Sequence, residues 1–398
     1  MTCAPESCSP EEIEKELTFV GLLGMIDPPR PEVVEAVRLA KGAGLKSVMV
    51  TGDYRDTAEA IAREIGLLTP GGLVLTGAEL DQMTDQELAA QAHEVDVCCR
   101  VSPANKTKIV DALKASGQIV AMTGDGVNDA PALKRANIGI AMGITGTDVS
   151  KESADMILTD DNFASIVSAI EQGRIIYSNI RKFVYFLLAC NVGEILIVFG
   201  AMLMGFPIPL RPIQLLWLNL VSDGAPALAL GMEKGEPDIM KEPPRPPTEP
   251  VINTDMAIGI AAVSVVDAIA ILLVFYLGMQ RYPGHVGHIE AAQTMAFVTL
   301  CISELLRAFT ARSEHHSVFT LGVFSNRWMV WATGASFIMV LLVVYVPFLQ
   351  PFFDTIPLTL GDWFFMAPFF FASPIAMELI KIYIRQRKNK MMRTLKEA

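Results

Sequence analysis

The chain has 398 residues and a formal net charge of −11, with 52% hydrophobic and only 19% charged residues. This composition is too apolar for an ordinary soluble enzyme and predicts several membrane spans. Most of the acidic excess lies in residues 1–182. An acidic half excludes nucleic acid as a partner, because phosphate backbones require a basic face. Residues 1–15 are polar and acidic, so no secretory signal is expected and this half should stay in the cytoplasm.

Short apolar runs alternate with amphipathic segments through the first half. The pattern predicts strands at 17–26, 46–51, 95–100, 119–123 and 138–142, and helices at 31–43, 55–67, 106–116 and 130–135. Strands and helices that alternate at this length indicate right-handed crossovers and a doubly wound parallel sheet. In such a sheet the chemistry collects in loops at the carboxyl ends of the strands.

Two loops have a composition that suits phosphoryl chemistry. Thr51-Gly52-Asp53 follows one predicted strand, and the run from Thr123 to Pro131, Thr-Gly-Asp-Gly-Val-Asn-Asp-Ala-Pro, follows another. Their glycines let backbone N–H groups approach an anion, while Asp125 and Asp129 offer hard oxygen ligands for magnesium. Lys106 begins a helix between these strands and could place a positive charge on the same phosphoryl group. The longer run is far too specific for a simple turn.

These motifs, together with Asp27-Pro-Pro-Arg30 and Lys106-Thr-Lys108, resemble the phosphorylation domain of P-type ATPases, which has a haloacid-dehalogenase-like α/β fold. The resemblance continues through 148–182 into the membrane half. It implies that Asp125 binds the catalytic Mg²⁺, with Asn128 and Asp129 organising the loop. It also implies a catalytic set that includes Thr51, Gly52, Asp53 and Lys106.

The resemblance is incomplete in one respect that concerns catalysis. The phosphorylated aspartate of the family lies in an Asp-Lys-Thr-Gly motif, which this sequence does not contain. Asn105-Lys-Thr-Lys is superficially similar, but asparagine cannot form an acyl phosphate. The family's Thr-Gly-Glu loop, nucleotide-binding domain and first four membrane helices have no counterpart either. We therefore expect the C-terminal part of a pump, inactive without a missing N-terminal part that would bind most of the ATP.

Six apolar segments follow, each long enough for a bilayer core: 183–203, 213–232, 256–279, 291–310, 328–348 and 363–384. Lys and Arg gather in alternate connections and in the tail. By the positive-inside rule, this predicts a multi-pass protein of the cell membrane with both termini cytoplasmic. The expected domains are 1–182 (cytoplasmic phosphorylation domain), 183–390 (six-helix all-α transmembrane cation-transport domain) and 391–398 (basic tail).

Several polar side chains lie inside these predicted spans, where each carboxylate costs roughly 2.5–3.5 kcal/mol. Gly224 and Pro226 interrupt the second span and free backbone groups beside a carboxylate, as in transporters. Oxygen donors without thiol or imidazole favour calcium. Asp267 has no polar neighbour at helical spacing and is interpreted as structural or lumen-facing, and the cysteines as buried or incidental thiols. The candidate cation ligands are Asn191, Glu194, Asn219, Ser222, Asp223 and Glu304.

This set resembles the sarcoplasmic-reticulum-type calcium pumps, in which the matching positions coordinate calcium. Arg307 lies one turn beyond Glu304 and could pair with it, taking over part of one cation site. The leading hypothesis is the C-terminal part of an ATP-driven calcium pump, with Mg²⁺-dependent phosphoryl chemistry coupled to ion translocation across the lipid bilayer. The alternatives are a P-type pump for another cation (magnesium, manganese or sodium/potassium) and a non-catalytic membrane subunit.

Overall fold

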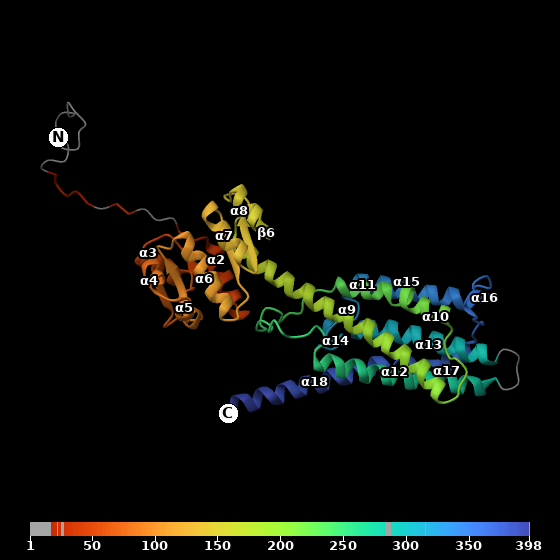
Figure 1. Cartoon of the computed structure of the whole chain (residues 1–398). Helices are drawn as coiled ribbons and strands as arrows, with labels where there is room; N and C mark the ends of the chain where they lie inside the picture. Colours follow the sequence, from red (N-terminus) through yellow and green to blue (C-terminus); the bar gives the residue numbers. More distant parts are fainter. Residues whose placement is uncertain (1–16, 22, 25–27, 283–287, 315, 398) are drawn as a thin grey trace. The chain divides into compact units, whose positions relative to one another are not determined.

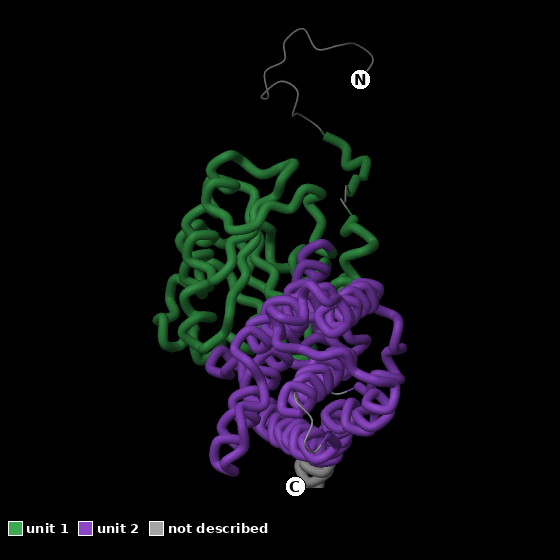
Figure 2. Tube along the Cα trace, turned by 90° about the vertical axis from the view of Figure 1, so that its right-hand side faces the viewer, with its two compact units in different colours: residues 1–38, 47–164 green, residues 39–46, 165–398 purple. Residues whose placement is uncertain are grey.

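The computed structural model describes residues 17–21, 23–24, 28–282, 288–314 and 316–397. The chain divides into two compact units (Figure 2). The first comprises Met1–Arg38 and Ser47–Ala164, and the second comprises Leu39–Lys46 and Ser165–Ala398. All the strands that the structure describes lie in the first unit, whereas the second is built from helices.

Two small parallel sheets form the centre of the first unit. One has the order β1–β3–β2, with β1 (Met49–Val50), β2 (Leu73–Thr76) and β3 (Val95–Cys99). The other has the order β4–β5–β6, with β4 (Ala121–Gly124), β5 (Ile138–Met142) and β6 (Met156–Leu158). Because every pair is parallel, the carboxyl ends of the strands in each sheet meet at one edge.

Helices connect these strands and cover both faces of the first sheet (Figure 1). The helices of this unit are α2 (Pro31–Gly42), α3 (Arg55–Glu64), α4 (Gly77–Gln82), α5 (Asp85–Gln91), α6 (Pro103–Ala115), the 3₁₀ turn η1 (Val127–Asp129), α7 (Ala130–Arg135) and α8 (Asp148–Ser153). Of these, α7 and α8 contact β5 of the second sheet. Val97 and Cys99 of β3 pack against α3, whereas Cys98 packs against α6. This arrangement confirms the predicted α/β class.

The predicted strand at 17–26 is wrong for the residues that the structure describes there. Residues 17–21 and 23–24 form no strand, and Leu17, Phe19, Val20 and Leu23 are exposed. An apolar run becomes a strand only when a neighbouring strand satisfies its backbone groups, and no described strand pairs with this one. The other predicted strands and helices correspond to β1, β3, β4, β5, α2, α3, α6 and α7.

Six helical segments of the second unit are long and apolar enough to cross a membrane, as predicted. They are α9 (Phe163–Leu203), which begins in the first unit; α10 (Pro212–Trp217), η2 (Leu218–Ser222) and α11 (Gly224–Gly231) together; α12 (Thr254–Arg281); α13 (His288–Thr310); α15 (Arg327–Tyr345); and α17 (Leu360–Phe370) with α18 (Ala372–Glu397). Short helices α14 (Val318–Leu321) and α16 (Gln350–Phe353) lie in connections.

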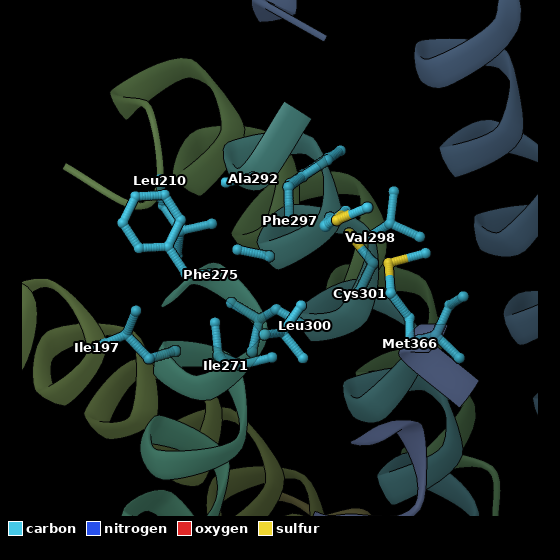
Figure 3. Packing of buried hydrophobic residues seen from close by; sticks show 14 of the residues in the cluster. Ile197, Leu210, Ile271, Phe275, Ala292, Phe297, Val298, Leu300, Cys301 and Met366 are labelled. Atoms are coloured by element: carbon cyan, nitrogen blue, oxygen red, sulfur yellow. The ribbon is translucent and has the colours of Figure 1, made fainter. Parts of the chain in front are cut away.

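The core of this unit surrounds α13. Phe297 and Leu300 of α13 pack with Ile271 and Phe275 of α12 (Figure 3), and α15, α17 and α18 also contact α13. Because neighbouring helices enclose α13, the polar residues in its second half are buried with the apolar ones.

Candidate functional site

The loop after β4 is organised around the Asp129 carboxylate. Its Oδ2 accepts hydrogen bonds from the backbone N–H groups of Asp125 (3.2 Å) and Gly126 (3.1 Å). Lys106 Nζ donates to its Oδ1 at 2.5 Å. A Cβ at Gly124 would lie 2.4 Å from Asp129 Cβ, so only glycine fits the end of the strand. The structure therefore brings the predicted Lys106 and Asp129 together.

The charge of Asp129 is stabilised although the side chain is buried. Burial alone raises the pKa of a carboxyl group, but the hydrogen bonds from Lys106 and Gly126 outweigh it and the pKa of Asp129 is lowered. Asn105, next to Lys106, has a structural role and does not replace the aspartate nucleophile. It forms a capping box with Ser102 at the start of α6 and donates to Asp81 at 2.7 Å.

Asp125 and Asn128 are exposed in the same loop. The Asp125 carbonyl accepts from Thr147 N–H (2.9 Å) and Ser150 Oγ (3.1 Å), which holds its backbone in place. An exposed carboxylate on a fixed backbone, next to a second carboxylate already held by a lysine, is a donor set that fits magnesium.

Thr51, Gly52 and Asp53 follow β1, which lies in the other sheet. Thr51 Oγ1 donates to Asp53 at 2.8 Å, and Asp53 N–H donates back to Thr51 Oγ1 at 3.2 Å. In the part of the chain that the structure describes, no hydrogen bond or ion pair joins this loop to Asp125 or Asp129. A joint role of the two loops in phosphoryl transfer thus stays a prediction.

In the membrane half, the second span is broken where the candidate ligands lie. Residues 218–222 form a π-helical turn, in which Asp223 N–H donates to Leu218 O at 2.9 Å. Pro226 has no N–H for the Ser222 carbonyl, and Ser336 Oγ of α15 donates to that oxygen and to Val221 O instead. The break therefore persists because another helix satisfies the freed carbonyls.

Two groups of candidate ligands meet at this break. Asn219 Nδ2 donates to both carboxylate oxygens of Glu194, at 2.8 and 3.1 Å. Asp223 and Glu304 are 0% exposed, and none of their four carboxylate oxygens has a hydrogen-bond partner. The Ser222 hydroxyl is likewise buried without a partner. Buried oxygens without partners are costly, and a bound cation would satisfy them.

Asn191 does not join these groups. Its side chain is exposed and donates to the Leu187 carbonyl of its own helix at 2.8 Å. Cys190, one residue earlier, is buried instead, and its Sγ lies within 4.8 Å of carboxylate oxygens of Asp223 and Glu304. The sequence did not predict a thiol beside these carboxylates.

A buried ion pair adjoins the same carboxylates. Arg307 donates to Asp267, to Ser373 Oγ (3.2 Å) and to Cys190 Sγ (2.9 Å). It also lies 3.5 Å from Glu304, as its position one turn away predicted. Asp267 accepts a further hydrogen bond from Ser303 at 2.9 Å. Its structural interpretation therefore agrees with the geometry, although helical spacing concealed its partners on α13.

Models of known protein families match both halves of the chain. Two models described as haloacid dehalogenase-like hydrolase match residues 6–137 and 105–170. A third, described as cation transporting ATPase, C-terminus, matches residues 207–383. The α/β unit, which contains the Asp125 loop, thus matches haloacid dehalogenase-like hydrolases, and the membrane unit, which contains the buried carboxylates, matches the C-terminal part of cation-transporting ATPases.

Individual relatives narrow this class. The chain is 49% identical over 360 residues to a calcium-transporting ATPase of Bacillus subtilis, covering 90% of this chain and 40% of the relative. It is 45% identical to calcium-transporting ATPase 1 of Bacillus cereus (94% and 43%) and 41% identical to human calcium-transporting ATPase type 2C member 1 (94% and 40%). The chain is therefore a multi-pass membrane homologue of the calcium-transporting P-type ATPases over most of its length. It spans about two fifths of the length of these relatives.

Proposed function

We propose that the chain supplies the magnesium-binding and cation-binding parts of an ATP-driven calcium pump. The observation that carries this proposal is the pair of buried carboxylates, Asp223 and Glu304, which have no hydrogen-bond partners beside a broken membrane helix. A membrane anchor or a purely structural subunit has no need of such groups, because each one destabilises an empty helix bundle.

The ion preference follows from the donors. Glu194, Asp223 and Glu304 provide carboxylates, while Asn219 and Ser222 add neutral oxygens. Calcium accepts six to eight oxygens in flexible geometry, whereas magnesium requires a tight octahedron and retains water. Because Arg307 already contributes a positive charge beside Glu304, the geometry favours one calcium ion held mainly by Glu194 and Asp223. Asn191 would join only after a change of side-chain rotamer.

In the first unit, Asp125 and Asn128 would hold magnesium, which when bound neutralises charge on a phosphoryl group. Asp129 positions the loop through its backbone hydrogen bonds, and Lys106 supports Asp129 from α6. Thr51, Gly52 and Asp53 are the proposed contacts to the phosphoryl group. The sequence contains no Asp-Lys-Thr-Gly nucleophile motif. We therefore propose that phosphorylation and most of the ATP contacts require residues outside this chain.

Calcium binding to the chain in lipid nanodiscs tests the proposal. We expect radioactive calcium to bind saturably, and Asp223→Asn to weaken its binding at least about tenfold, because one buried anionic ligand is lost. Glu304→Gln should have a smaller effect, because Arg307 offsets part of that charge. Asp354→Asn, an exposed carboxylate in the loop before α17, is the matched control and should bind calcium normally. Equal calcium affinity in Asp223→Asn and the unmodified chain would contradict the site.

A further inference from the structure

The candidate cation site contains a sulfur atom that calcium binding does not require. Cys190 is 0% exposed on α9, and its Sγ lies within 4.8 Å of oxygens from Asp223, where η2 meets α11, and Glu304 on α13. Three separate helical segments thus direct one sulfur and two carboxylates toward a common centre.

The two carboxylates supply an independent sign of a ligand at this centre. Both oxygens of Asp223 and both oxygens of Glu304 are buried without hydrogen-bond partners. A protein interior normally pairs such atoms with a donor, water or a metal ion. Among the described residues, the positively charged group that pairs with Glu304 is Arg307, and its guanidinium also pairs with Asp267 and donates to Ser373.

The surroundings of the sulfur suit a ligand rather than an inert thiol. Arg307 Nη2 donates to Cys190 Sγ at 2.9 Å, so a positive charge faces the sulfur from one side. The metal-binding form of cysteine is the thiolate, and a coordinated divalent cation itself removes the thiol proton. Cys301 on α13 is equally buried, but it does not belong to the group of ligand atoms that lie within 4.8 Å of one another.

We propose that Cys190, Asp223 and Glu304 form a mixed sulfur–oxygen site that binds a thiophilic divalent cation such as zinc or cadmium. Zinc takes sulfur at about 2.3 Å and carboxylate oxygen at about 2.0–2.2 Å. Ligand atoms around one such ion are therefore roughly 3–4 Å apart, and small side-chain rotations would close the present cluster to that spacing. Thiolate selects these ions over calcium, which prefers oxygen.

The inference rests on the proposed calcium site, because both ions would use Asp223. It predicts that zinc or cadmium competes with calcium and holds the site through a bond that calcium cannot form. The chain would then bind thiophilic ions as competitors or as alternative cargo, according to whether the complete pump releases them.

Cadmium is the probe, added as its chloride to the 398-residue chain in nanodiscs. We expect a sulfur-to-cadmium charge-transfer absorption and a ¹¹³Cd resonance shifted as sulfur ligation requires. Cys190→Ser should lower cadmium affinity roughly tenfold or more, since even outer-shell changes at metal sites cost 10–100-fold. Calcium affinity should change little. Cys301→Ser is the matched control and should keep cadmium binding intact.

Each outcome separates this inference from the proposed function. If calcium binds normally but Cys190→Ser retains the charge-transfer band and cadmium affinity of the unmodified chain, the sulfur site is refuted and the calcium site stands. If neither ion binds, both proposals fail. Should Cys190→Ser not fold, the unmodified chain remains decisive, because cadmium that binds without the sulfur signature, or that does not displace calcium, overturns the mixed site.

Discussion

Removing the guanidinium of Arg307 tests whether its ion pair with Asp267 stabilises the membrane half. Arg307 and Asp267 are 0% and 1% exposed, so both side chains are buried. Arg307→Met keeps an unbranched chain in place of the aliphatic part of arginine but removes the guanidinium, and so leaves Asp267 as an uncompensated buried charge. Breaking a buried pair in this way costs about 3–5 kcal/mol, which is more than a hundredfold in the unfolding equilibrium. We therefore expect at least about 3 kcal/mol of destabilisation.

The double variant separates the pair from its surroundings. Arg307→Met with Asp267→Leu removes both charges and should recover most of the loss, because an apolar replacement of a buried pair is often neutral. The matched control is Arg281→Met, since Arg281 pairs with Asp362 but is 40% exposed. That change should cost about 1 kcal/mol or less.

The assay is denaturant unfolding in mixed micelles, followed by tryptophan fluorescence. All four tryptophans, at positions 217, 328, 331 and 363, lie in the membrane half. If Arg307→Met is no less stable than Arg281→Met, or if the double variant recovers nothing, the structural role of the pair is refuted.

Three further predictions concern the rest of the chain. The pKa of Asp161 is lowered to about 2, first by the Ile144 N–H and then by Thr145 and Gly143. The ionised Asp161 carboxylate should therefore stabilise the fold fully above pH 4, and this stabilisation should be lost as the pH falls toward 2. Acid unfolding of Asp161→Asn should lack this loss of stability between pH 4 and pH 2. Asp125→Asn should weaken magnesium binding, measured calorimetrically, at least about tenfold, while the exposed Asp148→Asn should not; equal effects would contradict the magnesium loop. Tags at residues 1 and 398 should both be inaccessible from outside intact cells, and labelling of only one would indicate an odd number of spans.

The sequence was sufficient to predict the α/β class and the six spans, because hydrophobic length and periodicity act locally. It also contained unused signals. Thr76 with Glu79 and Thr84 with Glu87 are capping boxes that begin α4 and α5, and the Thr-x-x-Glu pattern could have located both helices. The strand predicted at 17–26 failed for the opposite reason, because strand formation depends on a partner that an apolar run does not encode.

The candidate cation site was predicted only in part. Helical spacing correctly placed Asn219 and Asp223 in one span. Spacing within a helix does not indicate, however, which residues of different helices contact one another. Cys190 appeared incidental because its neighbours in the cluster come from the junction of η2 with α11 and from α13. Asn191 appeared to be a ligand, whereas its side chain bonds to its own helix. Both differences depend on the rotation of α9 against its neighbours, which is a property of packing.

The length of α9 determines where Glu194 of the candidate cation site lies in the electric field across the membrane. Its 41 residues extend about 60 Å, roughly twice the hydrocarbon thickness of a bilayer. Lys182 pairs with Glu236, and Arg181 pairs with Glu314. Charged pairs of this kind are expected at the boundary of the membrane. Glu194 lies twelve residues further along, about 18 Å, which places it near the midplane.

An ion that reaches Glu194 from either side therefore crosses about half of the transmembrane field. One charge moved through 100 mV changes in energy by about 2.3 kcal/mol, so a divalent ion moved halfway changes by the same amount. Occupancy of the site should then depend on membrane voltage by roughly fiftyfold per 100 mV, even before any conformational change takes place.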